Sequence, residues 1–79
     1  MTSAIVLLNC RFPFDTTIPG KVSQFSAVSN VYRTSGVYDL VLKVTADTEN
    51  ELHKVVADKI GRIANVDSAL TMIIAPVTL

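Results

Sequence analysis

The chain has 79 residues, which is enough for one small domain but too short for two separate modules. Hydrophobic residues make up 49% of it and charged residues only 18%, so the chain does not belong to the disordered class. Seven basic residues balance seven acidic ones, and this neutrality argues against nucleic acid as a direct partner. The apolar excess predicts a surface that is buried against a second copy of the chain.

Cysteine and histidine occur once each, as Cys10 and His53. A single thiol excludes an intramolecular disulfide and indicates a reducing compartment. One thiol and one imidazole cannot form a Cys/His metal site within one chain, and we expect no cofactor. The apolar run in residues 4–8 follows no Lys or Arg and is too short for an export signal or a membrane span, so we expect a cytoplasmic protein without a membrane partner.

Two predicted elements fill the first third of the chain. Residues 4–12 form a strand that is apolar on both faces, with Val6, Leu8, Cys10 and Phe12 sharing one of them. Such a strand is expected in the centre of a sheet that is covered on both sides. Residues 16–27 predict a short helix that begins just before Pro19, since proline is tolerated only in the first turn.

Two strands, a helix and a last strand follow. Residues 31–35 and 38–45 are β-rich, and Gly36 between them supplies the positive φ of a tight hairpin. Thr48 and Glu51 form a capping box before an apolar helical stripe, in which Asp58 and Arg62 are spaced for an i, i+4 pair. Asn65 is expected to close this helix in a left-handed conformation. Residues 66–75 form the final strand, which Pro76 ends.

The order strand, helix, strand, strand, helix, strand predicts an α/β sandwich of the ferredoxin-like type, βαββαβ. Its four-stranded antiparallel sheet carries both helices on one face. The apolar residues on the other face need a second cover. A homodimer with its two sheets face to face, about 10 Å apart, provides this cover.

Five segments in this order resemble the C-terminal effector-sensing domain of the Lrp/AsnC, or feast/famine, transcriptional regulators, also called the RAM domain. The most specific part is Tyr-x-x-x-Gly-x-Tyr-Asp, formed by Tyr32, Gly36, Tyr38 and Asp39. The full set of resembling segments is 4–10, 31–40, 42–44, 46–52 and 66–74. The regulators also carry a helix-turn-helix, for which this chain has no residues, so residues 1–79 are expected to be a single stand-alone sensing domain.

The resemblance implies an amino-acid effector bound between dimers, which assemble into rings of four or five, that is, octamers or decamers. It places the hairpin, and polar residues of the last strand, near this ligand. Carried over by position, the predicted ligand-binding residues are Tyr32, Thr34, Gly36, Tyr38, Asp39, Ser68 and Thr71. The segment Ile18-Pro19-Gly20-Lys21 departs from the more acidic first helix of the family, which bears on assembly contacts more than on the pocket.

Two readings of Asp39 stay open at this level. In one, its carboxylate pairs with the ammonium of an amino acid while backbone N–H groups near Gly36 receive the ligand carboxylate. In the other, it accepts hydrogen bonds from the turn or pairs with Arg33.

Three further expectations concern single residues. His53 lies off the helical stripe and is expected in solvent. Cys10 is expected to be a small buried hydrophobic residue. Tyr32 and Tyr38 are expected to pack their rings and to keep their hydroxyl groups near polar partners.

No paired carboxylates, phosphate loop or nucleophile–base spacing appears, so we expect no enzyme. The predicted function is a small-molecule-binding regulatory module that acts through a partner, such as a full-length Lrp/AsnC regulator in mixed rings or a metabolic enzyme. Two alternatives remain. One is a small dimeric ferredoxin-like monooxygenase. The position of His53 argues against it, because His53 is the only histidine and lies off the expected cavity. The other is a ligand-free structural oligomer.

Overall fold

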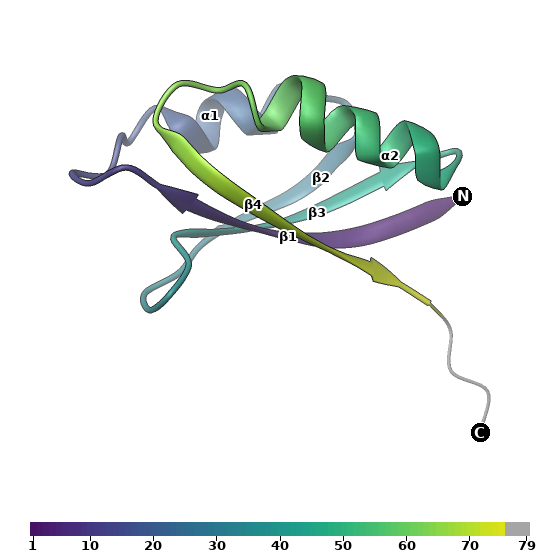
Figure 1. Cartoon of the computed structure of the whole chain (residues 1–79), viewed down its shortest axis with the longest axis horizontal. Helices are drawn as coiled ribbons and strands as arrows, with labels where there is room; N and C mark the ends of the chain where they lie inside the picture. Colours follow the sequence, from purple (N-terminus) through teal and green to yellow (C-terminus); the bar gives the residue numbers. More distant parts are fainter. Residues whose placement is uncertain (76–79) are drawn as a thin grey trace.

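A computed structural model describes residues 1–75 and shows two layers, a sheet and a pair of helices (Figure 1). The elements, in chain order, are β1 (Thr2–Cys10), α1 (Ile18–Ser23), β2 (Val28–Arg33), β3 (Leu40–Ala46), α2 (Glu49–Val55), the π-helix η1 (Val56–Ile60) and β4 (Val66–Ile74). The predicted βαββαβ order is confirmed. Pro76, expected to end the last strand, lies outside the described residues.

The four strands form one antiparallel sheet in the order β2-β3-β1-β4. β1 therefore lies in the interior of the sheet, as its apolar character predicted. In register, Leu7 faces Val41 of β3 on one side and Leu70 of β4 on the other. This strand order and the two helices on one face confirm the ferredoxin-like sandwich.

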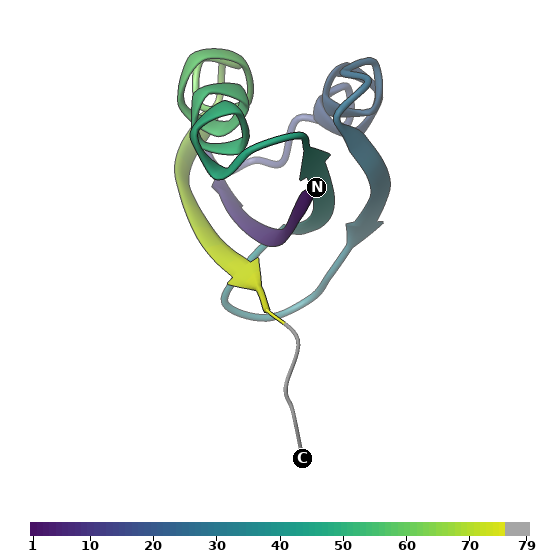
Figure 2. The ribbon, with the colours of Figure 1, turned by 90° about the vertical axis from the view of Figure 1, so that its right-hand side faces the viewer.

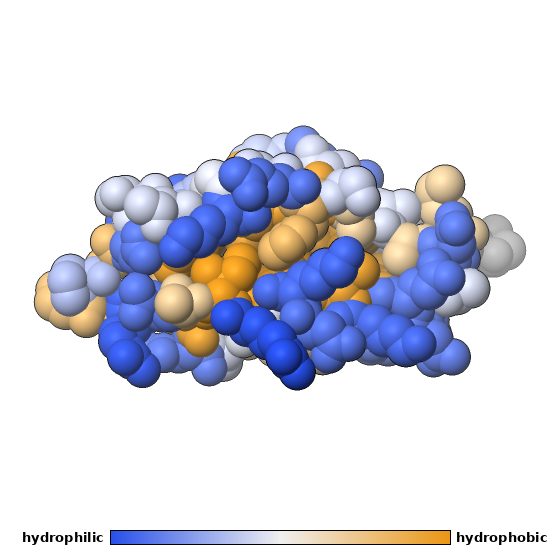
Figure 3. Space-filling view, turned by 90° about the horizontal axis from the view of Figure 1, so that it is seen from above, coloured by the Kyte–Doolittle hydropathy of each residue, from blue (hydrophilic) through white to orange (hydrophobic). Residues whose placement is uncertain are grey.

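The core lies between the sheet and the helices. Successive side chains of a strand point to opposite faces, so alternate residues of β1 and β3 meet the helices. These residues, together with those of the helical stripes, are the fully buried ones: Ala4, Val6, Leu8, Ile18, Val22, Leu40, Leu42, Val44, Leu52 and Ile60. On the helix side, hydrophilic residues cover much of the outer surface and hydrophobic ones show between the two helices (Figure 3).

The opposite face of the sheet has no helix over it (Figure 2). Apolar side chains nevertheless occupy it: Leu70, Met72 and Ile74 of β4 are each nearly half exposed, and Ile5 and Leu7 beside them are partly exposed. We call this surface the open face. Lys43 lies on the same face opposite Ile5, and Tyr32 lies opposite Val41, so β2 and β3 make their half of it more polar.

The first helix is shorter than predicted. It covers six residues, from Ile18 to Ser23, where residues 16–27 were expected. It begins just before Pro19, as predicted, because the missing N–H of proline costs nothing in a first turn. The predicted C-terminal end of this helix is wrong, because the apolar spacing of Phe25 and Val28 does not reflect a helix. Phe25 lies in a turn, and Val28 is the first residue of β2.

The second helix begins where the capping box predicts. The backbone N–H of Glu51 donates to Oγ1 of Thr48 at 3.1 Å. The helix widens into the π-helix η1, where the N–H of Gly61 donates to the carbonyl of Val56 at 2.7 Å. The helical path ends at Ile60, and Asn65 has the predicted left-handed conformation (φ 72°) but lies in the loop beyond it.

Two further predictions are corrected. Phe12 was predicted as the last residue of the first strand, on the face that it shares with Val6, Leu8 and Cys10, but β1 ends at Cys10 and Phe12 is 93% exposed. The predicted i, i+4 pair of Asp58 and Arg62 is absent from the ion pairs of residues 1–75. Asp58 lies in the π-helix η1, and Arg62 lies just beyond it. The hydrogen bonds of η1 join residues five apart instead of four, so side chains at i and i+4 no longer lie directly above one another.

Candidate functional site

The hairpin between β2 and β3 contains four of the seven predicted ligand-binding residues. Thr34 and Asp39 close it, because the Thr34 N–H donates to the Asp39 carbonyl at 3.0 Å. The Thr34 hydroxyl donates to the carbonyl of Tyr38 at 2.6 Å. Gly36 has φ 131°, a backbone conformation that residues with a Cβ atom rarely adopt. The turn therefore requires glycine, as predicted.

Asp39 attaches this hairpin to the end of β1. Its own N–H donates to the carbonyl of Leu8 at 2.9 Å, and its side-chain Oδ2 accepts the N–H of Cys10 at 2.7 Å. Neither form of the second interpretation of Asp39 is found within residues 1–75: its carboxylate accepts from the neighbouring strand β1, rather than from its own turn or from Arg33. This bond uses one carboxylate oxygen.

Arg33 is the last residue of β2, opposite Leu40 in the register. Its guanidinium carbon lies 3.8 Å from the centre of the Phe14 ring, in the loop between β1 and α1. Among the ion pairs of residues 1–75, none joins Arg33 to Asp39. Arg33 therefore does not form the predicted ion pair with Asp39. Its guanidinium stacks on the Phe14 ring instead.

Cys10 lies between these groups. It is partly buried and packs against the core, in line with its expected role as a small hydrophobe. Burial raises the pKa of its thiol, and the negative charges of Asp39 and Asp67 raise it further, while the charge of Arg33 acts in the opposite direction.

The two predicted residues of the last strand lie on opposite faces of the sheet. Ser68 is paired with Asn9, whose side-chain amide donates to its hydroxyl at 3.4 Å, next to the Cys10 end of β1. Thr71 is paired with Val6, which is buried beneath the helices. The fold therefore brings Ser68 to the end of the sheet that holds the hairpin and leaves Thr71 in mid-strand on the helix side.

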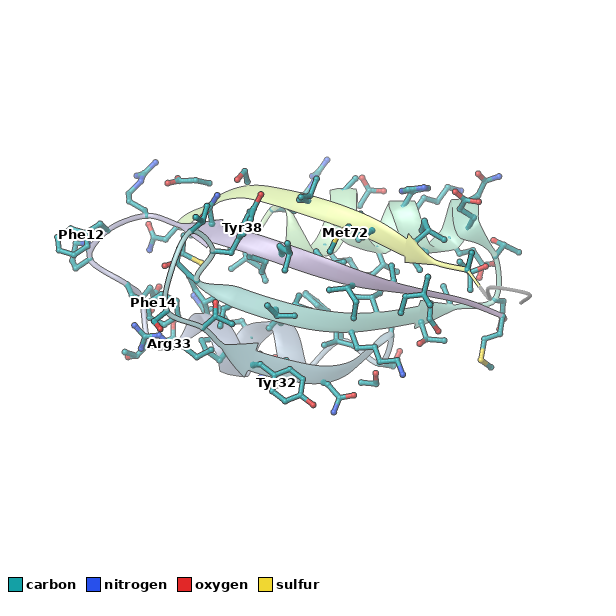
Figure 4. All side chains as sticks on the ribbon, turned by 90° about the horizontal axis from the view of Figure 1, so that it is seen from below. Phe12, Phe14, Tyr32, Arg33, Tyr38 and Met72 are labelled. Atoms are coloured by element: carbon teal, nitrogen blue, oxygen red, sulfur yellow. The ribbon has the colours of Figure 1, made fainter. Side chains whose placement is uncertain are left out.

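The two tyrosines also separate. Figure 4 views the open face and shows Tyr32 at the β2 edge and Tyr38 on the side of β1 and β4. Tyr32 is 57% exposed, so the packing expected for it is absent within one chain. His53 is exposed as predicted, with Nε2 3.5 Å from a carboxylate oxygen of Glu49.

Two features of this region were not predicted from the sequence: the backbone N–H of Cys10, which Asp39 accepts, and the stack of Arg33 on Phe14. The first carries no sequence signal, because any residue but proline supplies an N–H. The second carries no signal either, because it depends on the tertiary contact between the loop before α1 and the end of β2. Residues 1–75 enclose no detectable pocket and contain no cluster of three metal-ligating side chains.

Residues 15–76 match the model of the Lrp/AsnC ligand binding domain, which covers most of the chain. The chain belongs to this family. Its hairpin motif, the feature on which the resemblance chiefly rested, therefore lies in a domain that other proteins of the family use to bind ligands.

Two curated relatives are named as regulators. The chain is 28% identical over 74 residues to the HTH-type transcriptional regulator FL11 of Pyrococcus furiosus, an alignment that covers 94% of the chain and 48% of that protein. It is 42% identical over 53 residues to the regulatory protein AsnC of Haemophilus influenzae, with 67% of the chain and 35% of that protein covered. The chain thus spans half or less of the length of these relatives.

Solved structures share the fold. TTHA0845 from Thermus thermophilus superimposes with a TM-score of 0.89 at 26% identity, and the match covers 100% of this chain and 99% of that one. The regulator NMB0573 from Neisseria meningitidis, in complex with L-Met, has a TM-score of 0.83 at 17% identity over 95% of this chain and 50% of its own.

Within residues 1–75, no helix has the length and apolar character that crossing a membrane requires.

Proposed function

We propose that this chain is an amino-acid-binding regulatory module, not an enzyme, whose dimers assemble into a ring and modulate a partner regulator or enzyme. The observation that carries the proposal is the hairpin of the family's ligand-binding domain, fixed to the end of β1 through Asp39. The complex of NMB0573, a regulator of the same fold, with L-Met supports an amino acid as the proposed ligand class. The proposed function of this chain is inferred from these two similarities.

The open face supports a homodimer as the first level of assembly. Leu70, Met72 and Ile74 form a row of half-exposed apolar side chains along β4. Leaving such a row in water is unfavourable by about 25 cal/mol for each Å² of apolar surface. Two copies with their sheets face to face bury both rows, about 10 Å apart, and complete the second cover that the apolar strands need.

The hairpin supports the ligand-binding role. Asp39 uses Oδ2 on the Cys10 N–H and keeps Oδ1 for the ammonium of an amino acid. The ligand carboxylate is proposed to bind backbone N–H groups near Gly36. Because residues 1–75 enclose no pocket, we propose that a neighbouring dimer of the ring closes the site. Ligand binding then favours one assembly over another, provided that its affinity for the two differs.

The output passes through a partner, for which we propose a full-length Lrp/AsnC regulator in mixed rings or a metabolic enzyme. The relatives FL11 and AsnC are regulators longer than this chain. A free amino acid offers few atoms for contact, so its dissociation constant is expected between roughly micromolar and millimolar.

Isothermal titration of the chain with each of the twenty L-amino acids tests the ligand, and native mass spectrometry tests the assembly. Saturable binding of one or a few amino acids at one per subunit supports the proposal. A stable oligomer that binds none of them at millimolar concentration indicates a ligand-free structural oligomer and overturns it.

A further inference from the structure

The two edges of the sheet differ in how they are protected. The strand order leaves β2 at one edge and β4 at the other, as Figure 4 shows from the open face. An exposed edge carries a row of unpaired N–H and C=O groups, and proteins usually protect it with bulges, charges, proline or short strands. β2 has such protection: it is six residues long, a bulge interrupts its pairing between Val28 and Asn30, and Arg33 ends it.

β4 has little of this protection. It is nine residues long, and the irregularity in its pairing lies at its beginning, opposite Asn9 and Cys10, so residues 68–74 pair regularly with β1. This regular segment contains no charged residue, proline or glycine. The one charge of β4 is Asp67, which precedes the segment and forms an ion pair with Arg11 at 3.8 Å.

The outer side of the segment 68–74 has unpaired backbone groups. In an antiparallel ladder, alternate residues point their N–H and C=O groups away from the neighbouring strand. β1 therefore satisfies only part of the backbone of this segment. Within residues 1–75, no turn or loop forms a backbone hydrogen bond with it from the other side. The outer groups are thus free to bond one further strand.

The side chains of β4 are uncovered on both faces of the sheet. On the open face, Leu70, Met72 and Ile74 are each nearly half exposed. On the face that carries the helices, Ala69 and Ile73 are exposed as well. A cover on the open face alone would leave this second group in water. A strand beside β4 contacts side chains on both faces at once.

We propose that the outer edge of β4 pairs with the same edge of a second copy, antiparallel and centred on Thr71, so that two sheets join side by side. Two copies related by a two-fold axis offer the same strand to each other. This register pairs the whole segment 68–74 with its copy. It also assigns a position to Thr71, which the fold leaves away from the hairpin.

The proposed register is self-complementary. On the open face it sets Leu70 against Met72 of the second copy, and both side chains are apolar. On the helix side it sets Ala69 against Ile73. Opposed apolar pairs of this kind stabilise a sheet, and like charges placed opposite one another destabilise it. Asp67 falls beyond the paired segment, so no like charges meet.

This contact is separate from the sheet-to-sheet dimer and does not depend on a ligand. Two sheets joined side by side keep both open faces on the same side, where each can still take a second sheet. One self-contact ends at a dimer, whereas two different ones can build a larger closed assembly. The inference therefore goes beyond the proposed function and supplies the second contact that a ring of dimers needs.

Cysteine cross-linking distinguishes the edge contact from the sheet-to-sheet dimer. In a Cys10→Ala background, Thr71→Cys places one thiol on the helix side of β4, opposite its own copy in the proposed register. Residues directly opposed in such a ladder have Cα atoms about 4.5–5.5 Å apart, within the range of a disulfide. In a sheet-to-sheet dimer the two thiols lie on the outer sides of both sheets and cannot meet.

Val31→Cys in the same background is the matched control. Val31 is also a partly buried residue on the helix side of an edge strand, but it belongs to β2. Mild oxidation followed by non-reducing electrophoresis measures the covalent dimer that each variant forms at equal concentration. Thermal unfolding checks that each variant is folded.

Thr71→Cys is expected to become largely a covalent dimer, and Val31→Cys to stay uncoupled. Adding Ile73→Lys, which puts a charge on the helix side of the edge, should abolish the cross-link without changing the open face. A Thr71→Cys protein that forms no more covalent dimer than Val31→Cys overturns the pairing. A covalent dimer that forms only when the two variants are mixed places β4 beside β2 of another copy, and it overturns the pairing too.

Amide hydrogen exchange of the wild type provides a second measure that needs no substitution. Edge pairing should slow exchange throughout residues 68–74, whereas an unpaired edge leaves alternate amides as fast as the outer amides of β2. Fast alternate amides overturn the edge pairing and leave the amino-acid-binding function standing. A chain that protects the whole segment but binds no amino acid overturns that function and leaves the edge pairing standing.

Discussion

Oδ2 of Asp39 accepts the backbone N–H of Cys10 across 2.7 Å, and this bond joins the β2–β3 hairpin to the end of β1. The specific motif of the sequence is thus fixed to the sheet by the same residue that is proposed to bind the ligand. Any change in Asp39 is expected to affect both the position of the hairpin and its chemistry.

Asp39→Ala should lower the free energy of unfolding by about 1–3 kcal/mol, because it leaves the partly buried Cys10 N–H without its charged acceptor. Asp39→Asn keeps an acceptor oxygen and should lower it by less. Urea unfolding of the two variants and the wild type checks the order. Equal stability of Asp39→Ala and the wild type would show that the bond does not hold the hairpin.

The N-cap of α2 gives a second stability prediction. Thr48→Ala removes the acceptor of the Glu51 N–H and should cost about 1 kcal/mol. In a domain of this size such a loss lowers Tm by about 4–8 °C, which differential scanning calorimetry detects. Thr48→Ser, which keeps the hydroxyl, is the matched control and should stay close to the wild type. A Thr48→Ala protein that melts with the serine variant would refute the capping role.

Asp15 predicts a pH dependence. Its carboxylate accepts the Thr17 hydroxyl and N–H at 2.6 and 2.9 Å and the Asn65 amide at 3.2 Å. These hydrogen bonds, the Thr17 hydroxyl first, lower the pKa of Asp15 below its ordinary value of 3.8. A lowered pKa means that folding favours the charged form. The resulting stability is present above pH 4 and is lost as the pH falls through the lowered pKa.

Asp15→Asn should therefore be less stable than the wild type at pH 7, and the difference should shrink as the pH falls below 4. Urea unfolding at a series of pH values measures it, with Asp58→Asn on η1 as a control that loses a carboxylate elsewhere. A difference that stays constant from pH 7 to pH 2 would mean that the Asp15 hydrogen bonds do not depend on its charge.

The open face predicts the effect of a charge on assembly. Met72→Glu places a carboxylate in the middle of the apolar row on β4 and should dissociate the proposed sheet-to-sheet dimer, because the charge would have to be buried between the two sheets. Leu70→Glu, at one end of the row, should act in the same direction. Asn50→Glu adds the same charge on α2, on the helix side and away from the first helix, and should leave the mass unchanged. Light scattering gives these masses. A Met72→Glu protein with the wild-type mass would place the dimer interface elsewhere.

Much of this architecture can be predicted from the sequence because its signals are local. The capping box, the positive φ of Gly36 and the central position of β1 follow from residue type and spacing. The extent of α1 does not, since the spacing of Phe25 and Val28 fits a helix as well as a turn followed by a strand. The exposed Phe12 was misplaced because the alternation of β1 was continued beyond its last residue, Cys10.

The candidate site is predictable only in part. The hairpin residues are contiguous, so one motif contains them all. Ser68 and Thr71 are three positions apart on one strand, and side-chain alternation alone places them on opposite faces. The Cys10 N–H and the ring of Phe14 reach the site through tertiary packing, which leaves no pattern in the sequence.

We propose that this chain is an amino-acid sensor assembled from dimers, and native mass spectrometry of the wild-type chain, with and without the twenty L-amino acids, is the most direct test. A sensor of this kind should form a ring of dimers that gains one amino-acid mass per subunit or changes its size. A plain dimer that gains no mass with any of the twenty would contradict the proposed function.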